Sequence, residues 1–291
     1  MKLGFIGAGA VGQTLALALA SCGYSVVAVS SHSSASVEGL VRRIAGCVAL
    51  PEAQGVADRC DLVLITTPDE AIGPVAASVR WRQGQGVVHC SGATPLAVLR
   101  LAAEAGAAIA AFHPLQTITP PESADAAQAM MRDITFALEG KGWLLETLKG
   151  MAQKLGGRTV HLKSEDRVLY HAAATMGCLY VVALLRAAAE LWIQMGVGPD
   201  EALEALLPMT RRTLQNLSGE GVSPAVTGPI ARGDVTSIRR HLEAIQERAP
   251  RTLPLYCLLG LESLSLARDR VTPERIQQME ALLKEYLPAP G

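Results

Sequence analysis

The sequence predicts an α/β fold in which a doubly wound, mainly parallel sheet is followed by an all-α C-terminal domain. Three observations lead to this prediction. Short β-branched runs alternate with helical patterns up to about residue 162, a glycine-rich turn joins the first run to the first helix, and strand signals stop after Lys163. Such alternation is typical of βαβ units with a parallel sheet. We therefore expect a first domain at residues 1–162 and a helical domain at residues 163–291.

The individual elements follow from the same patterns. Strands are predicted at Lys2–Ile6, Ser25–Ser30, Leu62–Thr66, Val87–Cys90, Ala107–Phe112, Ile134–Leu138 and Thr159–Leu162. Helices of the first half are predicted at Gln13–Cys22, Ser36–Ala45, Asp69–Val79, Pro95–Ala105 and Trp143–Leu155. The second half is predicted to hold one long helix over Asp166–Met195, then helices at Asp200–Asn216, Val235–Glu247, Leu253–Arg268 and Pro273–Tyr286. The segments between these helices are mostly rich in Gly, Pro and Ser, which break helices.

Composition excludes several classes of partner. Of the 291 residues, 49% are hydrophobic, 18% charged and 4% aromatic, and the formal net charge is -1. A nucleic-acid or acidic-membrane surface needs a concentrated excess of Lys and Arg, so we expect neither partner. A core of small aliphatic residues suits closely packed helices on a parallel sheet. The composition therefore favours a protein that acts on small molecules.

Cysteine usage and targeting signals favour a cytoplasmic protein. The six cysteines form no CxxC pair and have no zinc-ligand spacing, so we expect buried thiols in a reducing compartment and no metal site. No secretory signal precedes the first predicted strand. The longest apolar stretch, Ala172–Leu185, is shorter than the roughly 20 residues of a membrane span. We predict that it is a buried helix of a soluble protein.

The glycine-rich turn has the pattern GxGxxG between a predicted strand and a predicted helix, the context that gives this motif meaning. Its glycines would permit the tight turn, the close approach of a pyrophosphate, and close packing of helix on strand. The helix N-terminus would supply free N–H groups to the phosphates. We expect dinucleotide binding here, and the alternative is a turn that has lost its ligand. The residues are Gly7, Ala8, Gly9, Ala10, Val11 and Gly12.

The residues after the second predicted strand favour NADP(H) over NAD(H). An NAD enzyme would place Asp or Glu there to bind the ribose 2′-hydroxyl. This chain has hydroxyl groups and an imidazole instead, with no acidic residue before Glu38 and no adjacent Arg. The alternative is a polar loop that caps the next helix. The predicted cofactor-binding residues are Ser30, Ser31, His32 and Ser33, and Thr66, Thr67 and Pro68 after a later strand would contact the nicotinamide half.

Polar residues at further strand ends are candidates for chemistry. Ser91 and His113 should lie on the cofactor side of the sheet, where ligands bind in this fold. His113 could donate a proton to a reduced carbonyl or imine because the pKa of histidine is ordinarily near neutral pH. A loop-fixing role is the alternative for His113. His89, inside its strand, is expected to be a buried structural residue.

The helical half offers two candidate groups. Arg167 and His171 share one helix face at i and i+4, so they could bind an anionic substrate or form a solvated pair. A stiff Gly- and Pro-containing loop holds Thr227, Arg232 and Asp234 before a helix. Asp234 is well placed to cap that helix. Arg232 and His241 would remain available for a ligand or for an ion pair with Asp234.

Several of these segments together resemble a known family. They are Gly7–Gly12, Pro68-Asp69, Ser91-Gly92, His113-Pro114-Leu115, Tyr170–Ala174 and Thr227–Asp234 followed by His241. The chain resembles the Rossmann-like, DUF2520-type proteins, which are distant relatives of pyrroline-5-carboxylate reductase, ketopantoate reductase and the β-hydroxyacid dehydrogenases. The resemblance implies a Rossmann domain, a helical domain, a dimer and an NADP-dependent oxidoreductase. The chain departs from the family in having Arg167 where Lys is usual and Leu179 where relatives tend to have Asn.

These observations lead to one expected function and its alternatives. We expect a cytoplasmic NADP(H)-dependent reductase of a small carbonyl or imine acid, homodimeric through its helical domain. His113 or His171 would be the acid, and Arg167 and Arg232 would attract the substrate carboxylate. The alternative is a non-catalytic nucleotide-binding or regulatory protein that keeps the fold. A deazaflavin as hydride partner is supported by fold analogy alone.

Overall fold

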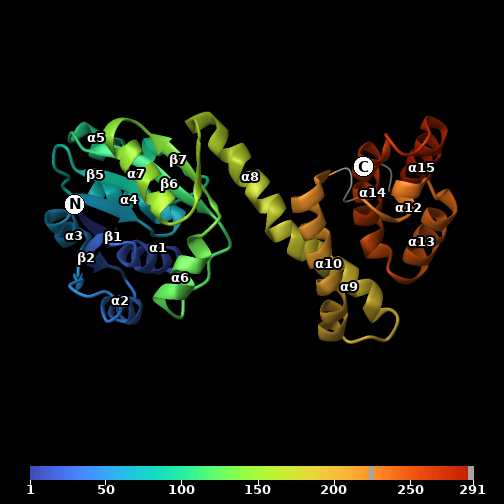
Figure 1. Cartoon of the computed structure of the whole chain (residues 1–291), viewed down its shortest axis with the longest axis horizontal. Helices are drawn as coiled ribbons and strands as arrows, with labels where there is room; N and C mark the ends of the chain where they lie inside the picture. The colour runs from blue at the N-terminus through green and yellow to red at the C-terminus, as the bar shows by residue number, and fades with distance from the viewer. Residues whose placement is uncertain (223–225, 288–291) are drawn as a thin grey trace. The chain divides into compact units, whose positions relative to one another are not determined.

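The computed structural model describes residues 1–222 and 226–287 (Figure 1). The chain forms two compact units, Met1–Cys178 and Leu179–Gly291. The predicted division lies before the long helical segment that starts near residue 163, whereas the compact units divide within it. We call them the N-terminal unit and the C-terminal unit.

The N-terminal unit is built on an eight-stranded sheet in the order β3-β2-β1-β4-β5-β6-β7-β8. All neighbouring strands are parallel except β6 and β7, so the prediction of a mainly parallel sheet is confirmed. The prediction missed the short strand β3, because its two residues are too few to show the alternation of a strand. The strands are β1 Lys2–Ile6, β2 Ser25–Ser30, β3 Val48–Ala49, β4 Leu62–Ile65, β5 Gly86–His89, β6 Ala108–Leu115, β7 Thr135–Gly140 and β8 Arg158–His161.

Helices cover both faces of this sheet, which makes it doubly wound. Residues of β1 alternate between two hydrophobic cores: Leu3 and Phe5 belong to one, and Ile6 to the other. Helices α1, α6 and α7 pack on the first core, and α3, α4 and α5 on the second. The helices are α1 Ala10–Ser21, α2 Ser34–Val41, α3 Ala53–Arg59, α4 Asp69–Ser78, α5 Arg100–Glu104, α6 Ala124–Met131, α7 Gly142–Lys154 and α8 Arg167–Gly177.

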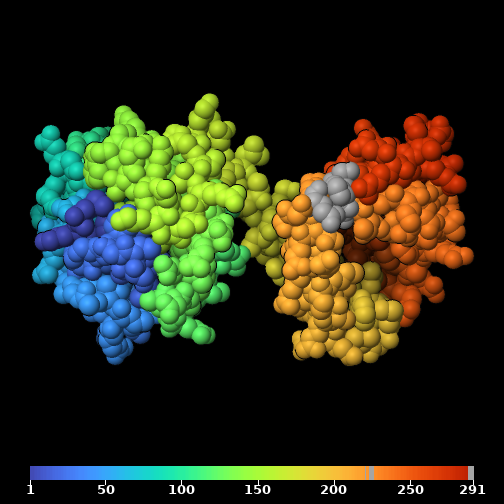
Figure 2. Space-filling view, viewed as in Figure 1, coloured from blue at the N-terminus to red at the C-terminus, as the bar shows by residue number. Residues whose placement is uncertain are grey.

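The C-terminal unit contains helices and no strand among its described residues. Helices α13, α14 and α15 bury a core that includes Leu242, Cys257 and Met279. Helices α9 and α10 pack side by side and are gold in Figures 1 and 2. The helices are α9 Leu179–Ile193, α10 Pro199–Glu220, α12 Gly228–Arg232, α13 Val235–Arg248, α14 Leu253–Ala267 and α15 Pro273–Glu285.

The long helical segment departs from the sequence prediction in two ways. It breaks at Cys178, where φ is -120° and ψ is -79°, so it forms two helices, α8 and α9. The prediction that Ala172–Leu185 is buried is wrong, because apolar side chains in it such as Met176 (64% exposed) and Val182 (61% exposed) lie on the surface. In the part of the chain that the structure describes, one helical stretch, Ser164–Ile193, is long and apolar enough to cross a membrane by length and composition.

Candidate active site

The glycine-rich turn connects β1 to α1 at the carboxyl end of the sheet. Gly7 has a φ of +109°, a conformation that favours glycine. A Cβ on Gly12 would lie 2.4 Å from the Gly7 carbonyl oxygen, whereas a Cβ on Gly9 would meet no atom within 4 Å. No side chain caps the N-terminus of α1. The turn therefore needs Gly7 and Gly12 for its own geometry and has open space beside Gly9 and the first N–H groups of α1, as a bound pyrophosphate requires.

Side chains hold this turn in place. Gln13 Nε2 donates to the Ala8 carbonyl (2.9 Å), and Thr66 Oγ1 donates to the Gly7 carbonyl (2.8 Å). Arg43 Nη2 donates to Gln13 Oε1 (2.8 Å), and Arg43 Nη1 donates to the Pro121 carbonyl (2.9 Å). Thr66 was predicted to contact the cofactor, but its hydroxyl donates to the backbone of the turn. The hydrogen bonds of Arg43 to Gln13 and Pro121 were not predicted, because no local pattern indicates which element an Arg side chain will reach.

The residues after β2 divide between structure and surface. Ser30 is buried, and its carbonyl accepts from the Gly7 N–H (2.8 Å). Ser33 Oγ accepts from the Ser36 N–H (3.3 Å) and so caps α2, which is the alternative role weighed for this loop. Ser31 is half-buried and His32 is exposed. These two residues remain the candidates for contact with the adenosine ribose.

The ends of β4 and β5 are tied together by hydroxyl and carboxylate groups. Ser91 Oγ donates to Asp69 Oδ2 (2.7 Å) and accepts from the N–H of Thr94 (2.9 Å). A catalytic role was predicted for Ser91, but in the structure its hydroxyl holds the loop after β5 through these hydrogen bonds. Asp69 begins α4, as expected, and Pro68 beside it is exposed. Thr67 Oγ1 is buried without a hydrogen-bond partner.

An imidazole and a phenol meet next to this loop. His113 Nδ1 and the Tyr170 hydroxyl lie 2.7 Å apart, with the rings edge to face. A Cβ on Gly92 would lie 3.0 Å from His113 Nε2 and 3.0 Å from His171 Cδ2, so the absence of a side chain at Gly92 lets both imidazoles approach. The structure thus places both imidazoles, predicted as alternative acids, beside Gly92, and it adds Tyr170, for which no role was predicted.

Arg167 is a buried charge rather than a substrate-binding group. Its guanidinium is 0% exposed, donates to Glu139 Oε2 (3.2 Å) and donates to the Ser91 carbonyl. Glu139 also accepts a hydrogen bond from Ser164. The predicted roles of Arg167, catalysis and attraction of a substrate carboxylate, are therefore wrong in this structure, because its Nη1 and Nη2 groups are engaged inside the protein and its side chain is fully buried. The i, i+4 spacing predicted a helix face shared with His171, but it could not reveal that Arg167 pairs with Glu139 on β7.

The register of the sheet explains how this charge is accommodated. His89, Ala111 and Glu139 are aligned across β5, β6 and β7, so their side chains share one face of the sheet. Arg167 donates to Glu139 at one end of this row and to the Ser91 carbonyl, which follows β5. His89 is 0% exposed, which confirms the prediction that it is buried.

Burial and the Arg167 charge determine the protonation of these groups. Burial, then Arg167, and then His113 lower the pKa of His89 to about 3. Burial, followed by Arg167 and His171, lowers the pKa of His113 to about 4. His113 is therefore neutral at pH 7, which corrects the expectation that its pKa is near the operating pH. Burial raises the pKa of Tyr170 to about 12, although Arg167 opposes this shift.

The buried polar atoms that lack a hydrogen-bond partner cluster here. Over residues 1–222 and 226–287 they are Thr67 Oγ1, both ring nitrogens of His89, and Arg167 Nε. All lie at or just after the carboxyl ends of β4 and β5, or at the start of α8. Such atoms are rare in folded proteins and need a specific explanation. Their concentration at this edge indicates a functional site.

The candidate residues of the C-terminal unit lie around two separate cavities. Thr227 and Tyr256 line an apolar cavity of about 400 Å³, and Tyr256 Oη lies 2.8 Å from His241 Nδ1. Arg232 and Asp234 line a cavity of about 320 Å³. Asp234 caps α13 by accepting from the Ser237 N–H (3.0 Å), as predicted, and no ion pair joins it to Arg232. The structure therefore does not gather the four predicted substrate residues at one point.

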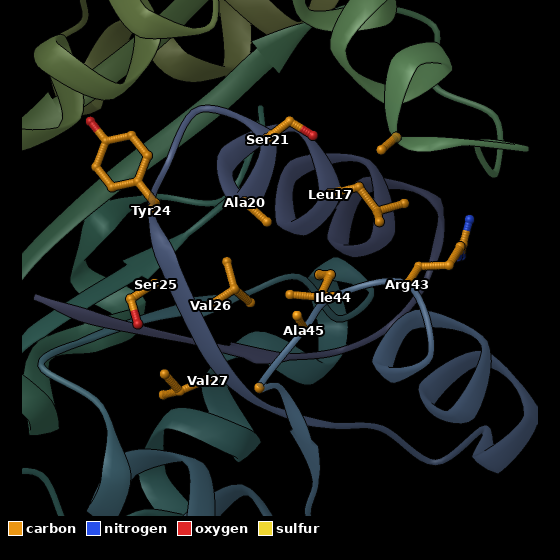
Figure 3. A pocket seen from close by; sticks show the side chains of 12 residues that line it. Leu17, Ala20, Ser21, Tyr24, Ser25, Val26, Val27, Arg43, Ile44 and Ala45 are labelled. Atoms are coloured by element: carbon orange, nitrogen blue, oxygen red, sulfur yellow. The ribbon is translucent and has the colours of Figure 1, made fainter.

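Another cavity, of about 360 Å³, lies beside the amino end of β2 (Figure 3). It is lined by the end of α1 and the beginning of β2, including Leu17, Ser21 and Val26. Ligands of parallel α/β sheets bind at the carboxyl ends of the strands, so this cavity is separate from the candidate active site. Among the described residues, no cluster of His, Cys, Asp and Glu could hold a metal ion.

Solved structures share the fold of the whole chain. A Bacteroides fragilis protein provisionally named an NADP oxidoreductase has a TM-score of 0.69 at 24% identity, over 91% of this chain and 97% of that one. An Aspergillus terreus reductive aminase, in complex with NADPH and ethyl levulinate, has a TM-score of 0.66 at 17% identity, over 98% and 99%. Plasmodium falciparum pyrroline carboxylate reductase with NADP bound has a TM-score of 0.59 at 12% identity, over 97% and 98%. At these identities the likeness establishes the fold.

Family models identify both parts of the sequence, whereas no curated protein matches it. Residues 1–114 match the model of a Rossmann-like domain. Residues 134–263 match the model of DUF2520, a domain of unknown function. The chain therefore carries a Rossmann-like domain followed by a DUF2520 domain, which confirms the resemblance to the Rossmann-like, DUF2520-type proteins.

Proposed function

We propose that this protein is an NADP(H)-dependent oxidoreductase that reduces a small carbonyl or imine acid. The observation that carries the proposal is the position of the His113–Tyr170 pair at the carboxyl edge of the same sheet whose first turn is open beside Gly9. A nucleotide on that turn would extend along the edge where proton-carrying groups are gathered. The structures with related folds include a reductive aminase and a pyrroline carboxylate reductase with NADPH or NADP.

The residues present fit a dinucleotide. Gly9 and the uncapped N-terminus of α1 would hold the pyrophosphate, since a Cβ at Gly9 is the group that would obstruct it. Ser31 and His32 would donate hydrogen bonds to a 2′-phosphate, and no carboxylate after β2 repels it before Glu38. NADP(H) is therefore favoured over NAD(H). When bound, the cofactor supplies the hydride.

The chain's own residues would orient the substrate and supply a proton. The pair of His113 and Tyr170 lies where a reduced carbonyl or imine would be placed. His171 is exposed beside this pair and is a further candidate for proton transfer. Beyond burial, Arg167 would act on this pair as a fixed positive charge that further lowers the pKa of His113. Arg232 of the C-terminal unit, which makes no ion pair among the described residues, remains a candidate for binding a carboxylate.

A second candidate function is nucleotide binding without catalysis. Two observations favour it: His113 is neutral at pH 7, and Arg167 is engaged in a buried ion pair. A protein that kept the glycine-rich turn but lacked effective proton transfer would bind NADPH. It would not oxidise NADPH, whichever substrate is offered. Turnover with a panel of keto acids and imines, with His171→Ala as a control, distinguishes the two functions.

Thermal unfolding with NADPH, NADP, NADH and NAD tests the cofactor. Ligands that bind only the native state raise its apparent stability, so the phosphorylated forms should raise the Tm more than the others. Gly9→Ala should leave the Tm without ligand almost unchanged and remove most of the NADPH-dependent rise. Gly150→Ala, which also meets no neighbouring atom but lies inside α7, should raise the Tm without ligand slightly through helix propensity and should keep the wild-type NADPH-dependent rise. Equal shifts with all four nucleotides would contradict the NADP(H) assignment.

We further propose that the protein is a cytoplasmic homodimer without nucleic-acid or membrane partners. The apolar side chains exposed on α8, such as Val168, Leu169 and Met176, support self-association, because exposed apolar surface of this kind is uncommon on a soluble monomer. The even charge balance supports the absence of a polyanionic partner.

A further inference from the structure

Tyr170 is placed to take part in the chemistry, although the sequence gave it no role. Its hydroxyl lies 2.7 Å from His113 Nδ1, and the two ring centroids are 5.6 Å apart with an interplanar angle of 89°. Both residues are half-buried. The contact joins β6 to α8 and lies next to the Ser91–Gly92 loop.

The two nitrogens of His113 have different surroundings. Nδ1 is occupied by Tyr170, whereas Nε2 makes no hydrogen bond to any described residue. Nε2 lies beside Gly92, where a Cβ would approach it to 3.0 Å. The absence of a side chain at Gly92 therefore leaves this edge of the imidazole clear, at the end of the sheet where ligands bind.

The charges around the pair restrict how protons are distributed. Because burial lowers the pKa of His113 to about 4, the imidazole holds one ring proton at pH 7. Because burial raises the pKa of Tyr170 to about 12, its hydroxyl keeps its proton. The buried guanidinium of Arg167 favours a negative charge on the phenol oxygen if that proton leaves. Neither group is a strong acid by itself, but together they can pass a proton.

We propose that Tyr170 and His113 form a proton relay in which Tyr170 O–H donates to Nδ1 and Nε2–H faces the oxygen of a substrate carbonyl. The proposal rests on the reductase function proposed above. As the carbonyl carbon receives a hydride from NADPH, the carbonyl oxygen takes the Nε2 proton and Nδ1 takes the Tyr170 proton. The products are the alcohol, NADP⁺ and a tyrosinate that regains its proton from water. An iminium substrate already carries its proton, so its reduction does not need the relay.

The direction of the Tyr170–His113 hydrogen bond decides between this relay and a structural contact. A neutral imidazole presented as a donor can polarise a carbonyl without being an imidazolium. If instead Nδ1 carried the proton and donated it to the phenol oxygen, Nε2 would have no proton to give. The two arrangements place the single ring proton on different nitrogens, which can be measured without any turnover.

Nitrogen-15 NMR of the histidine side chains in the full chain, without nucleotide at pH 7, measures this direction. The His113 signals are assigned by their loss in His113→Gln. We expect a proton on Nε2 in the wild type, and in Tyr170→Phe a downfield shift of Nδ1 together with a higher His113 pKa. Tyr180→Phe, which alters an exposed ring, should change neither. A proton on Nδ1 in the wild type, or an Nδ1 signal unchanged in Tyr170→Phe, would overturn the relay.

Turnover with a panel of ketones and preformed iminium ions provides the second readout. Tyr170→Phe should lower kcat for carbonyl reduction about 10²-fold, the usual size of general acid catalysis, and leave iminium reduction and the KM for NADPH nearly unchanged. Equal losses for both substrate types, or no loss, would contradict the relay. If the wild type neither binds nor oxidises NADPH, the reductase function fails, and the NMR result still decides how Tyr170 and His113 share their protons.

Discussion

The two units of the molecule present their polar groups in opposite ways. In the N-terminal unit, Arg167, Glu139 and His89 are buried at the carboxyl edge of the sheet. In the C-terminal unit, Thr227, Arg232 and His241 are exposed. Buried groups are held in fixed geometry by their neighbours, as proton transfer requires, whereas exposed groups can adapt to a ligand. We therefore expect substitutions of the buried groups to change stability more than substitutions of the exposed groups.

The largest expected effect comes from removing the buried charge. Arg167→Met leaves Glu139 without its ionic partner inside the protein, so we expect the free energy of unfolding to fall by about 3–5 kcal/mol. Arg232→Met, which changes an exposed guanidinium of the other unit, should alter it by less than about 0.5 kcal/mol. Urea denaturation of both variants measures the contrast, and similar losses in both would break the comparison between the units.

The next effect is a loss of stability in mild acid. His89 must stay neutral in the folded protein until the pH falls to about 3, whereas in the unfolded chain its pKa is near 6.5. The unfolded state therefore binds a proton that the native state does not, and stability falls as the pH decreases below 6.5. By pH 5, His89 should account for a loss of about 2 kcal/mol.

His89→Leu should weaken this pH dependence, and urea denaturation between pH 5 and 8 measures it. His241→Leu, at an exposed position of the C-terminal unit, is the matched control and should keep the wild-type dependence. A His89→Leu curve parallel to that of the wild type would mean that burial does not hold this imidazole neutral.

The smallest expected effect on stability comes from the exposed apolar face of α8. Leu169→Glu should change the free energy of unfolding of one chain by less than about 0.5 kcal/mol, because the side chain is 74% exposed. If the proposed homodimer forms through α8, this substitution should nevertheless shift the mass of the protein in sedimentation from that of a dimer to that of a monomer. Leu101→Glu, on α5 and 42% exposed, should leave the dimer intact. A dimer that tolerates both substitutions would exclude α8 from the interface.

Local patterns accounted for much of the fold because their signals are contained in short segments. The glycines of the first turn, the strands β1 and β2, and the cap at Asp234 each depend on neighbours within a few residues. Where a segment has a weak local signal, the prediction failed. The prediction missed α6, Ala124–Met131, and the break at Cys178 lies within a continuous apolar pattern.

The candidate site could be predicted only in outline. The rule that ligands bind at the carboxyl ends of parallel strands selected His113 and Ser91 correctly as residues of that edge. It could not reveal that Ser91 donates a hydrogen bond to Asp69, because Asp69 lies at the start of α4, 22 residues earlier in the chain. Nor could it give the pKa of His113, which depends on burial and on the charge of Arg167.

The sequence by itself determined the α/β order of the N-terminal unit, the open glycine turn, and the match to the Rossmann-like and DUF2520 models. These properties follow from backbone conformation and hydrophobic periodicity, which are local. Only the tertiary structure decided that Arg167 is paired with Glu139 and that His113 meets Tyr170. Those contacts join residues 28 and 57 positions apart, and their strength depends on exclusion of water, which no spacing in the sequence encodes.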